Sequence, residues 1–176
     1  MLNQFEEVEK IIFIPVNKKY PKDGLLDNNH RLNMLKLVAE KNSKFQISDM
    51  DMNEDKSLPT IQTLEKIQKQ FPQKRIWFLI GSDNLKNLHT WNNAEELILK
   101  YKILVMEREN DNMDEIIKNN SLFFKYKENF QRLNEEIRSN YSSTYARKQL
   151  KEGKSIRYLI PEEILKYIQE NNLYRR

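Results

Sequence analysis

The sequence contains no cysteine, only three glycines and no apolar run long enough to cross a membrane. Without cysteine, the chain has no disulfide framework, no thiolate nucleophile and no Cys-ligated metal. Three glycines leave no Gly-rich phosphate cradle, which argues against ordinary dehydrogenases and P-loop enzymes. Residues 1–10 carry Glu6, Glu7 and Glu9, where a signal peptide is basic and apolar. We therefore expect a cytoplasmic protein that has no membrane partner.

Charge and composition favour one folded domain. The chain has 30 Lys and Arg against 26 Asp and Glu, a net charge of +4, without a long basic block. Nucleic-acid binding is therefore not expected. With 39% hydrophobic and 32% charged residues, the chain is polar but has enough apolar side chains to fold. Its 176 residues predict a single domain over residues 1–176.

Short apolar runs alternate with segments of helical spacing. Strands are expected at residues 10–15, 45–48, 75–80 and 102–107, and helices at 30–42, 60–71, 93–99, 142–152 and 161–171. This alternation predicts an α/β fold with a three-layer parallel sheet. Residues 110–140 are charged and Asn-rich, and they predict a helical insertion whose inward side chains are Phe123, Phe124, Phe130 and Leu133. Asn93 with Glu96 resembles a capping box.

Two short motifs indicate phosphate chemistry. Ser142, Ser143 and Thr144 begin a helix that carries Arg147 one turn later, and a helix start with hydroxyls and a cation is a ready anion site. Gly81 and Asp83 follow the apolar strand at residues 75–80. Ligands of open α/β sheets bind at the carboxyl ends of strands. We expect both motifs to face one cleft that binds a nucleotide.

The order of motifs resembles the bacterial nicotinate-nucleotide adenylyltransferases of the nucleotidyltransferase superfamily. The resemblance runs along nearly the whole chain. It covers the strand and Tyr20-Pro21-Lys22 loop, the helix start at residues 30–35, the segment 59–64, Gly81-x-Asp83 with Trp91, the Ser142-Ser143-Thr144-x-x-Arg147 motif, and the closing helix at residues 158–174. It implies a Rossmann-like nucleotidyltransferase fold with a helical C-terminal part.

One family feature has no counterpart in the 176 residues. The family begins with a strand and a Gly-x-Phe-Asp-Pro-x-His-x-Gly-His loop, and no such segment occurs here. We therefore expect the first, central strand of the family's sheet to be missing. A chain that lacks its natural start, a degenerate relative, and another element in the gap are three explanations that stay open.

The resemblance implies transfer of AMP from ATP to nicotinate mononucleotide, with Mg²⁺ accompanying the ATP. It implies that Gly81, Asp83, Ser142, Ser143, Thr144 and Arg147 bind ATP and its phosphates, and that Lys22, Thr60 and Trp91 bind the nicotinate nucleotide. Pro59 and Gln62 stand where the family has tyrosine and aspartate, which weakens the case for Thr60. Arg108 follows a strand end but is not selected as a site residue, and no metal-ligating residues are expected.

Plain structural roles compete with each assignment. The serine-led helix start is also what an ordinary capped helix has, Asp83 also suits a helix cap, and Trp91 also suits the core. Two other functions stay open: a catalytically impaired nucleotide-binding module, and nucleotidyl transfer to another phosphorylated acceptor. The oligomeric state is also open, a homo-oligomer included.

Overall fold

The strands form two parallel sheets in the computed structural model, which describes residues 8–20, 24–108, 111–133 and 143–174. β1 (Ile11–Phe13) pairs with β2 (Phe45–Ile47). In the second sheet β4 (Lys102–Met106) lies between β3 (Trp77–Gly81) and β5 (Phe130–Arg132). The expected parallel pairing is confirmed. Within the described residues β1, β2, β3 and β5 each pair with a strand on one side only.

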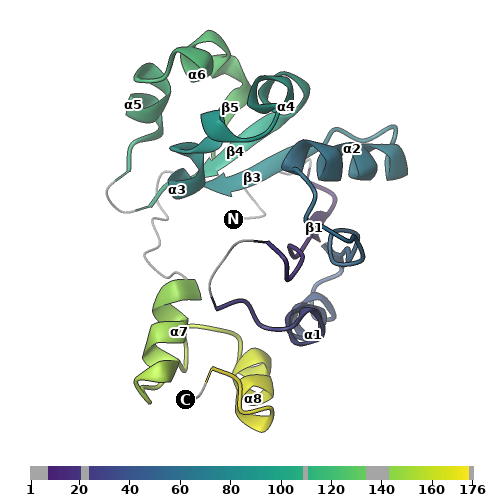
Figure 1. The fold of residues 1–176 in the computed structure, drawn as a ribbon, viewed down its shortest axis with the longest axis vertical. Coiled ribbons are helices and arrows are strands. Elements are labelled where there is room, and N and C mark those ends of the chain that lie inside the picture. The colour runs from purple at the N-terminus through teal and green to yellow at the C-terminus, as the bar shows by residue number, and fades with distance from the viewer. Residues whose placement is uncertain (1–7, 21–23, 109–110, 134–142, 175–176) are drawn as a thin grey trace. The chain divides into compact units, whose positions relative to one another are not determined.

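The described residues group into two compact units. The central unit contains the described residues within 58–133, with β3, β4 and β5 side by side in Figure 1. The terminal unit contains the described residues within 8–57 and 143–174, with β1 and β2. A single domain over residues 1–176 stays a prediction.

Apolar side chains from helices and strands fill the core of the central unit. In α2 (Thr60–Gln70), Ile61, Leu64 and Ile67 are buried at the helical spacing read from the sequence. α4 (Ala94–Lys100) contributes Leu97 and Ile98, which are fully buried. The core therefore joins both helices to β4, whose Ile103 and Val105 are also fully buried.

The segment 111–133 is less helical than the sequence predicts. It forms α5 (Met113–Lys118), α6 (Ser121–Lys125) and a 3₁₀ turn at Lys127–Asn129 before β5. The strand was not expected, because three residues are too few to show an alternating pattern. Phe123, Phe130 and Leu133 are buried as predicted, but Phe124 is 54% exposed, so its inward placement is wrong.

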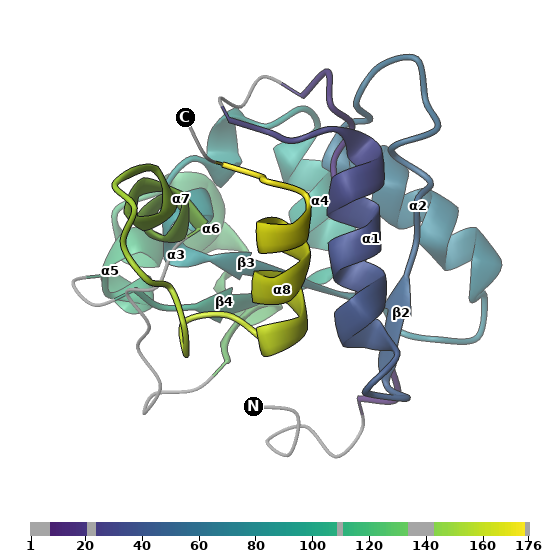
Figure 2. The same cartoon turned by 90° about the horizontal axis from the view of Figure 1, so that it is seen from below.

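The described residues of the terminal unit also form three helices, one between β1 and β2 in the chain and two near its C-terminal end. α1 (Asn28–Ala39) lies beside α8 (Glu162–Glu170), as Figure 2 shows. Met34, Ile168 and Leu173 form a buried cluster there. α7 (Ser143–Lys151) is followed by Gly153 at φ +70°, a conformation that glycine adopts without strain and that confirms it as the stop.

Two expectations about helix starts need correction. Asn93 precedes α4 in the left-handed region (φ 55°) and makes no side-chain hydrogen bond to the free N–H groups, so the capping box is wrong. Its amide instead donates to the Glu96 carboxylate at 3.1 Å. Pro161, the first residue of the helix expected at residues 161–171, lies just before α8, and Glu162 and Glu163 occupy the first turn. Among the described residues, no helix is long and apolar enough to span a membrane.

Candidate functional site

The carboxyl end of β3 carries the first predicted motif. Gly81 is the last residue of β3, opposite Met106 of β4, and α3 (Ser82–Leu85) begins directly after it. Asp83 lies in the first turn of α3, and its side chain is 52% exposed. Its carboxylate is therefore accessible at the sheet edge where parallel strands offer ligand sites.

Arg108, which follows β4, holds the Asp83 carboxylate. The Arg108 Nε lies 3.1 Å from Asp83 Oδ1, and Nη2 donates to Oδ2 at 3.3 Å. Each arm of the guanidinium thus meets one carboxylate oxygen. The Nη2 contact is a hydrogen bond, whereas Nε lies at ion-pair distance from Oδ1 without hydrogen-bond geometry. Arg108 was not predicted as a site residue, because a contact between residues 25 positions apart leaves no local pattern in the sequence.

A buried serine connects the ends of β3 and β4. The Ser82 hydroxyl, which is fully buried, donates to Asp111 Oδ2 at 2.7 Å and accepts a hydrogen bond from the Arg108 backbone N–H at 3.0 Å. Asp111 also pairs with Lys86. The Lys86 ammonium above all, then the Ser82 hydroxyl and the Arg108 charge, hold the pKa of Asp111 below its ordinary value. Ser82 and Asp111 therefore fix the backbone from which Arg108 projects.

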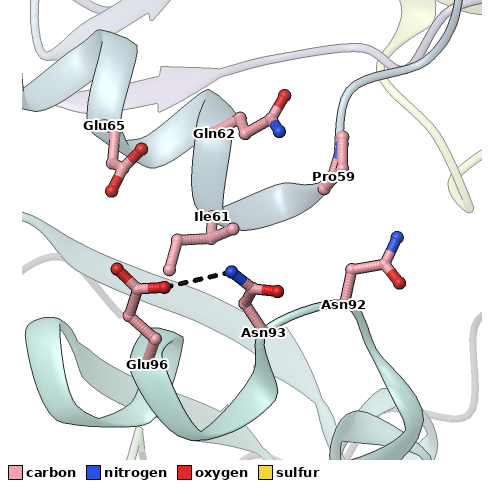
Figure 3. A pocket seen from close by; sticks show the side chains of 7 residues that line it. All are labelled: Pro59, Ile61, Gln62, Glu65, Asn92, Asn93 and Glu96. Atoms are coloured by element: carbon pink, nitrogen blue, oxygen red, sulfur yellow. Dashed lines mark hydrogen bonds between the residues drawn. The ribbon is translucent and has the colours of Figure 1, made fainter.

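A pocket of about 370 Å³ lies where the start of α2 meets the start of α4 (Figure 3). Its lining residues are Pro59, Ile61, Gln62, Glu65, Asn92, Asn93 and Glu96. Lys100 Nζ lies 2.7 Å from Glu65 and 2.6 Å from Glu96, so its single positive charge offsets one of the two negative charges. The pocket is thus polar with one uncompensated negative charge at Glu65 and Glu96, and it also presents carboxamide groups that donate and accept hydrogen bonds.

The two central-unit residues expected at the nicotinate nucleotide flank this pocket. Thr60 is the first residue of α2, between the lining residues Pro59 and Ile61, and Trp91 precedes the lining residue Asn92. Neither side chain is itself in the lining. The Trp91 ring packs edge-on against Phe78, with centroids 6.2 Å apart, and adjoins the core. The structure therefore brings the two segments together at one pocket, and Trp91 has a core role there.

The terminal unit carries the second motif at the start of α7. Ser143 and Thr144 are exposed in the first turn, and Arg147 Nη2 donates to the Thr144 hydroxyl at 3.3 Å. Arg147 is half-buried and has no carboxylate partner among the residues that the structure describes. A half-buried guanidinium without an anion is costly unless a ligand supplies one. Ser142 and Lys22 lie outside the described residues.

A second arginine lies near the same surface. Arg31 of α1 donates from Nε to the Leu26 carbonyl at 3.0 Å and from Nη2 to the Asn28 side chain at 2.6 Å. Burial lowers the pKa of Arg31 and raises that of Tyr174, and the positive charges of Arg147 and Arg31 partly oppose the rise at Tyr174. Both cations therefore act on one tyrosine, and the sequence analysis did not select Arg31.

The loops after β1 and β2 are tied together by two buried polar residues, Asn17 and Asp51. The Asn17 N–H donates to Asp51 Oδ2 at 2.8 Å, and its amide donates to the backbone carbonyls of Asp51 and Glu54 at 3.2 and 2.6 Å. This arrangement fixes the base of the loop that leads to Tyr20-Pro21-Lys22. Neither residue was predicted from the sequence, because their contact spans 34 positions.

The sequence is similar to a family of nucleotidyltransferases and to adenylyltransferases of known name. Residues 1–149 match the cytidylyltransferase-like family. A probable nicotinate-nucleotide adenylyltransferase of Caldicellulosiruptor bescii is 34% identical over 98% of this chain and 87% of its own length. One of Clostridium tetani is 33% identical over 96% of this chain and 86% of its own length.

A solved structure shows the same fold. The Plasmodium falciparum nicotinic acid mononucleotide adenylyltransferase complexed with NaAD aligns with a TM-score of 0.77 over 94% of this chain and 82% of that one. The two sequences are 24% identical, so this likeness speaks for the fold alone. The Rossmann-like nucleotidyltransferase architecture is thereby confirmed.

Proposed function

The chain belongs to the nicotinate-nucleotide adenylyltransferase family, and we propose how its residues transfer AMP from ATP to nicotinate mononucleotide in NAD biosynthesis. The products are deamido-NAD and pyrophosphate. The observation that carries this function is the 30–34% identity to relatives of that name over 94% or more of the chain.

The reaction is a direct displacement at phosphorus. A phosphate oxygen of nicotinate mononucleotide forms a bond to the α-phosphorus of ATP, while the bond from that phosphorus to the bridging oxygen breaks. The bridging oxygen takes the electron pair and leaves with pyrophosphate. Because the attacking phosphate is already a good nucleophile, the protein has to align two polyanions and neutralise their charge rather than form a covalent intermediate.

The start of α7 suits the phosphates of ATP. We assign this contact to the hydroxyls of Ser142, Ser143 and Thr144 and to Arg147. Its support is the exposed first turn and the lack of any carboxylate partner for Arg147 among the described residues. At the carboxyl end of β3, Gly81 permits a close approach, and the Asp83 carboxylate accepts hydrogen bonds from the ribose of ATP.

The pocket between α2 and α4 suits the nicotinate end of the acceptor. Thr60 and its neighbours offer polar contacts to the pyridine carboxylate, and the Trp91 side chain provides an apolar surface beside the pocket. Lys22 contributes a positive charge to the acceptor phosphate. The carboxamides of Gln62 and Asn92 add donors for an anionic ligand.

The family uses ATP together with a divalent metal, and we propose that Mg²⁺ arrives as part of the ATP substrate. Among the described residues, no group of three or more His, Asp or Glu side chains lies close enough to hold a metal ion. Mg²⁺ usually keeps several waters and binds phosphate oxygens, so a site without a protein cage fits an ion that enters with the nucleotide.

The test is product formation by the purified protein with Mg²⁺ and ATP. Deamido-NAD and pyrophosphate are expected with nicotinate mononucleotide, and a lower kcat/KM with the nicotinamide form. Failure to form either dinucleotide with a folded protein would contradict the function.

Arg147→Ala tests the phosphate contact. Because a hydrogen bond to a charged group contributes about 1.5–3 kcal/mol, kcat/KM for ATP should fall about 10- to 100-fold. Lys151→Ala, near the end of the same helix, removes the same charge and should leave kcat/KM within about twofold. Equal effects of the two substitutions would argue against a phosphate contact at Arg147.

A further inference from the structure

The Asp83–Arg108 pair at the carboxyl end of β3 is placed differently from an ordinary surface ion pair. Two guanidinium nitrogens meet the two carboxylate oxygens at 3.1 and 3.3 Å. The Asp83 side chain is 52% exposed, whereas that of Arg108 is 32% exposed. The arginine is therefore the more buried partner, and the exposed carboxylate keeps lone pairs for further hydrogen bonds.

Gly81 provides the space that this pair occupies. A Cβ atom at Gly81 would collide with Asp83 Oδ1 and would lie 3.8 Å from Arg108 Nε. The φ of Gly81 is −79°, which any residue adopts. Glycine is therefore required here for room rather than for backbone freedom, and the room is filled by the carboxylate of Asp83.

Buried contacts fix the backbone that carries Arg108. Its N–H donates to the Ser82 hydroxyl, which is fully buried and donates in turn to Asp111. Asp111 is held by Lys86. Both ends of the Asp83–Arg108 contact thus start from backbone that Ser82 fixes, so the carboxylate has one defined orientation.

We propose that Arg108 is a positioning residue that aims the Asp83 carboxylate at the ribose hydroxyls of ATP. This inference rests on the proposed function of Asp83. Arg108 acts through Asp83 and does not touch the nucleotide. The free lone pairs of the carboxylate accept from the ribose hydroxyls while the others stay on the guanidinium, so the ion pair persists in the complex.

The experiment measures binding of Mg²⁺-ATP and of Mg²⁺-2′,3′-dideoxy-ATP by isothermal titration calorimetry, for the wild type, Arg108→Gln, Arg108→Lys and Asp83→Asn. Arg108→Gln should weaken ATP binding roughly tenfold, because the Asp83 carboxylate is no longer held in place for its hydrogen bonds to the ribose. It should change dideoxy-ATP binding less than about twofold, because the hydroxyls that Asp83 contacts are absent. Arg108→Lys should resemble Arg108→Gln, because a flexible ammonium does not reproduce the position and direction of the Nη2 hydrogen bond.

Two measurements distinguish a positioning role of Arg108 from a purely structural one. Exposed ion pairs contribute little to stability, so the melting temperatures of the Arg108 variants should stay close to that of the wild type. Lys125→Gln removes one positive charge elsewhere in the central unit and should leave both affinities unchanged.

Three results would overturn the inference. These are an equal loss of affinity for ATP and dideoxy-ATP in Arg108→Gln, full affinity for ATP in Arg108→Lys, and a wild type that binds both nucleotides equally well. The first would indicate a direct phosphate contact by Arg108, the second an effect of charge alone, and the third no role for Asp83 at the ribose. A wild type that makes deamido-NAD while giving the first or second result would keep the proposed function and lose only the inference, whereas the third would also remove the ribose contact assigned to Asp83 and leave the overall reaction standing.

Discussion

At Gly81, the substitution Gly81→Ala should weaken ATP binding while leaving the stability of the fold nearly unchanged. In Gly81→Ala the new Cβ would displace the Asp83 carboxylate, which is the far end of a flexible side chain, rather than any backbone. Asp83 can turn outward at little cost, so the melting temperature should change by only a few degrees. ATP affinity should fall about tenfold, because the contact with Arg108 is lost. Calorimetric titration and thermal melts of the same samples measure the two effects.

Gly153→Ala is the matched control. Gly153 has φ +70° with no atom within 4 Å of the added Cβ, so its substitution strains the backbone and touches no ligand contact. It should lower the melting temperature and leave ATP affinity intact. The opposite pattern, with Gly81→Ala strongly unfolded and Gly153→Ala neutral, would contradict the explanation given for Gly81.

Some residues of the candidate site could be predicted from the sequence, and others could not. Gly81 and Asp83 could be predicted, because they directly follow an apolar strand, and strand ends are ligand positions in this fold class. Arg108 could not, because its contact with Asp83 spans 25 residues, and Asn17 could not, because its contact with Asp51 spans 34. Such contacts depend on the packing of whole elements.

At the scale of elements, the start of α4 offers a test of the corrected helix cap. Asn93 adopts the left-handed conformation, which asparagine tolerates better than serine, and it does not cap the helix with its side chain. Asn93→Ser should therefore destabilise the protein by about 1 kcal/mol, although serine is a good cap residue. The free energy of unfolding in urea measures the change.

Asn120 at the start of α6 is the matched comparison. Its side chain accepts from the N–H groups of Leu122 and Phe123 at 3.1 and 3.2 Å, which is true capping. Because serine caps about as well as asparagine, Asn120→Ser should be nearly neutral. If Asn93→Ser were neutral and Asn120→Ser costly, the assignment of the two caps would have to be exchanged.

Elements could be predicted where a pattern was long, and were missed where it was short. The apolar spacing of Ile61, Leu64 and Ile67 defines α2, and the apolar run before Gly81 defines β3. β5 escaped prediction, because its three residues pair with β4 only through the register of the folded sheet. Phe124 was also wrongly predicted to be buried. Of the two adjacent phenylalanines only Phe123 packs into the core, and the sequence does not show which of them does so.

At the scale of the whole molecule, acidic groups of lowered pKa occur in both units. Hydrogen bonds from lysines or other donors hold the pKa below its ordinary value in Asp27, Glu95, Glu96, Asp111, Glu152 and Glu163. On the basic side, Tyr126 and then Glu95 raise the pKa of Lys125 to about 12. These pairs therefore keep their charges over the whole neutral range.

The sign of the pH dependence follows from these directions. A carboxyl group whose pKa is lower in the folded than in the unfolded state stabilises the fold above its unfolded value, and this contribution is lost as pH falls through the folded value. The ordinary values are 3.8 for aspartate and 4.5 for glutamate. The melting temperature should thus be level from about pH 5 to pH 8 and fall below about pH 4. Lys125 does not contribute to this fall. Its pKa is raised, and the stabilisation linked to a raised pKa is lost only as pH rises through that value.

Salt distinguishes this explanation from general acid denaturation. Most of the carboxylates and their lysine partners are exposed, so about 0.5 M NaCl should screen them and reduce the fall between pH 5 and pH 3. Lys86→Gln removes the partner of Asp111, which is less exposed, and should reduce the fall even at low salt. Thermal melts across this pH range at two salt concentrations make the measurement. A melting temperature that stays level to pH 3, or a fall that salt leaves unchanged, would show that these pairs do not set the acid stability of the molecule.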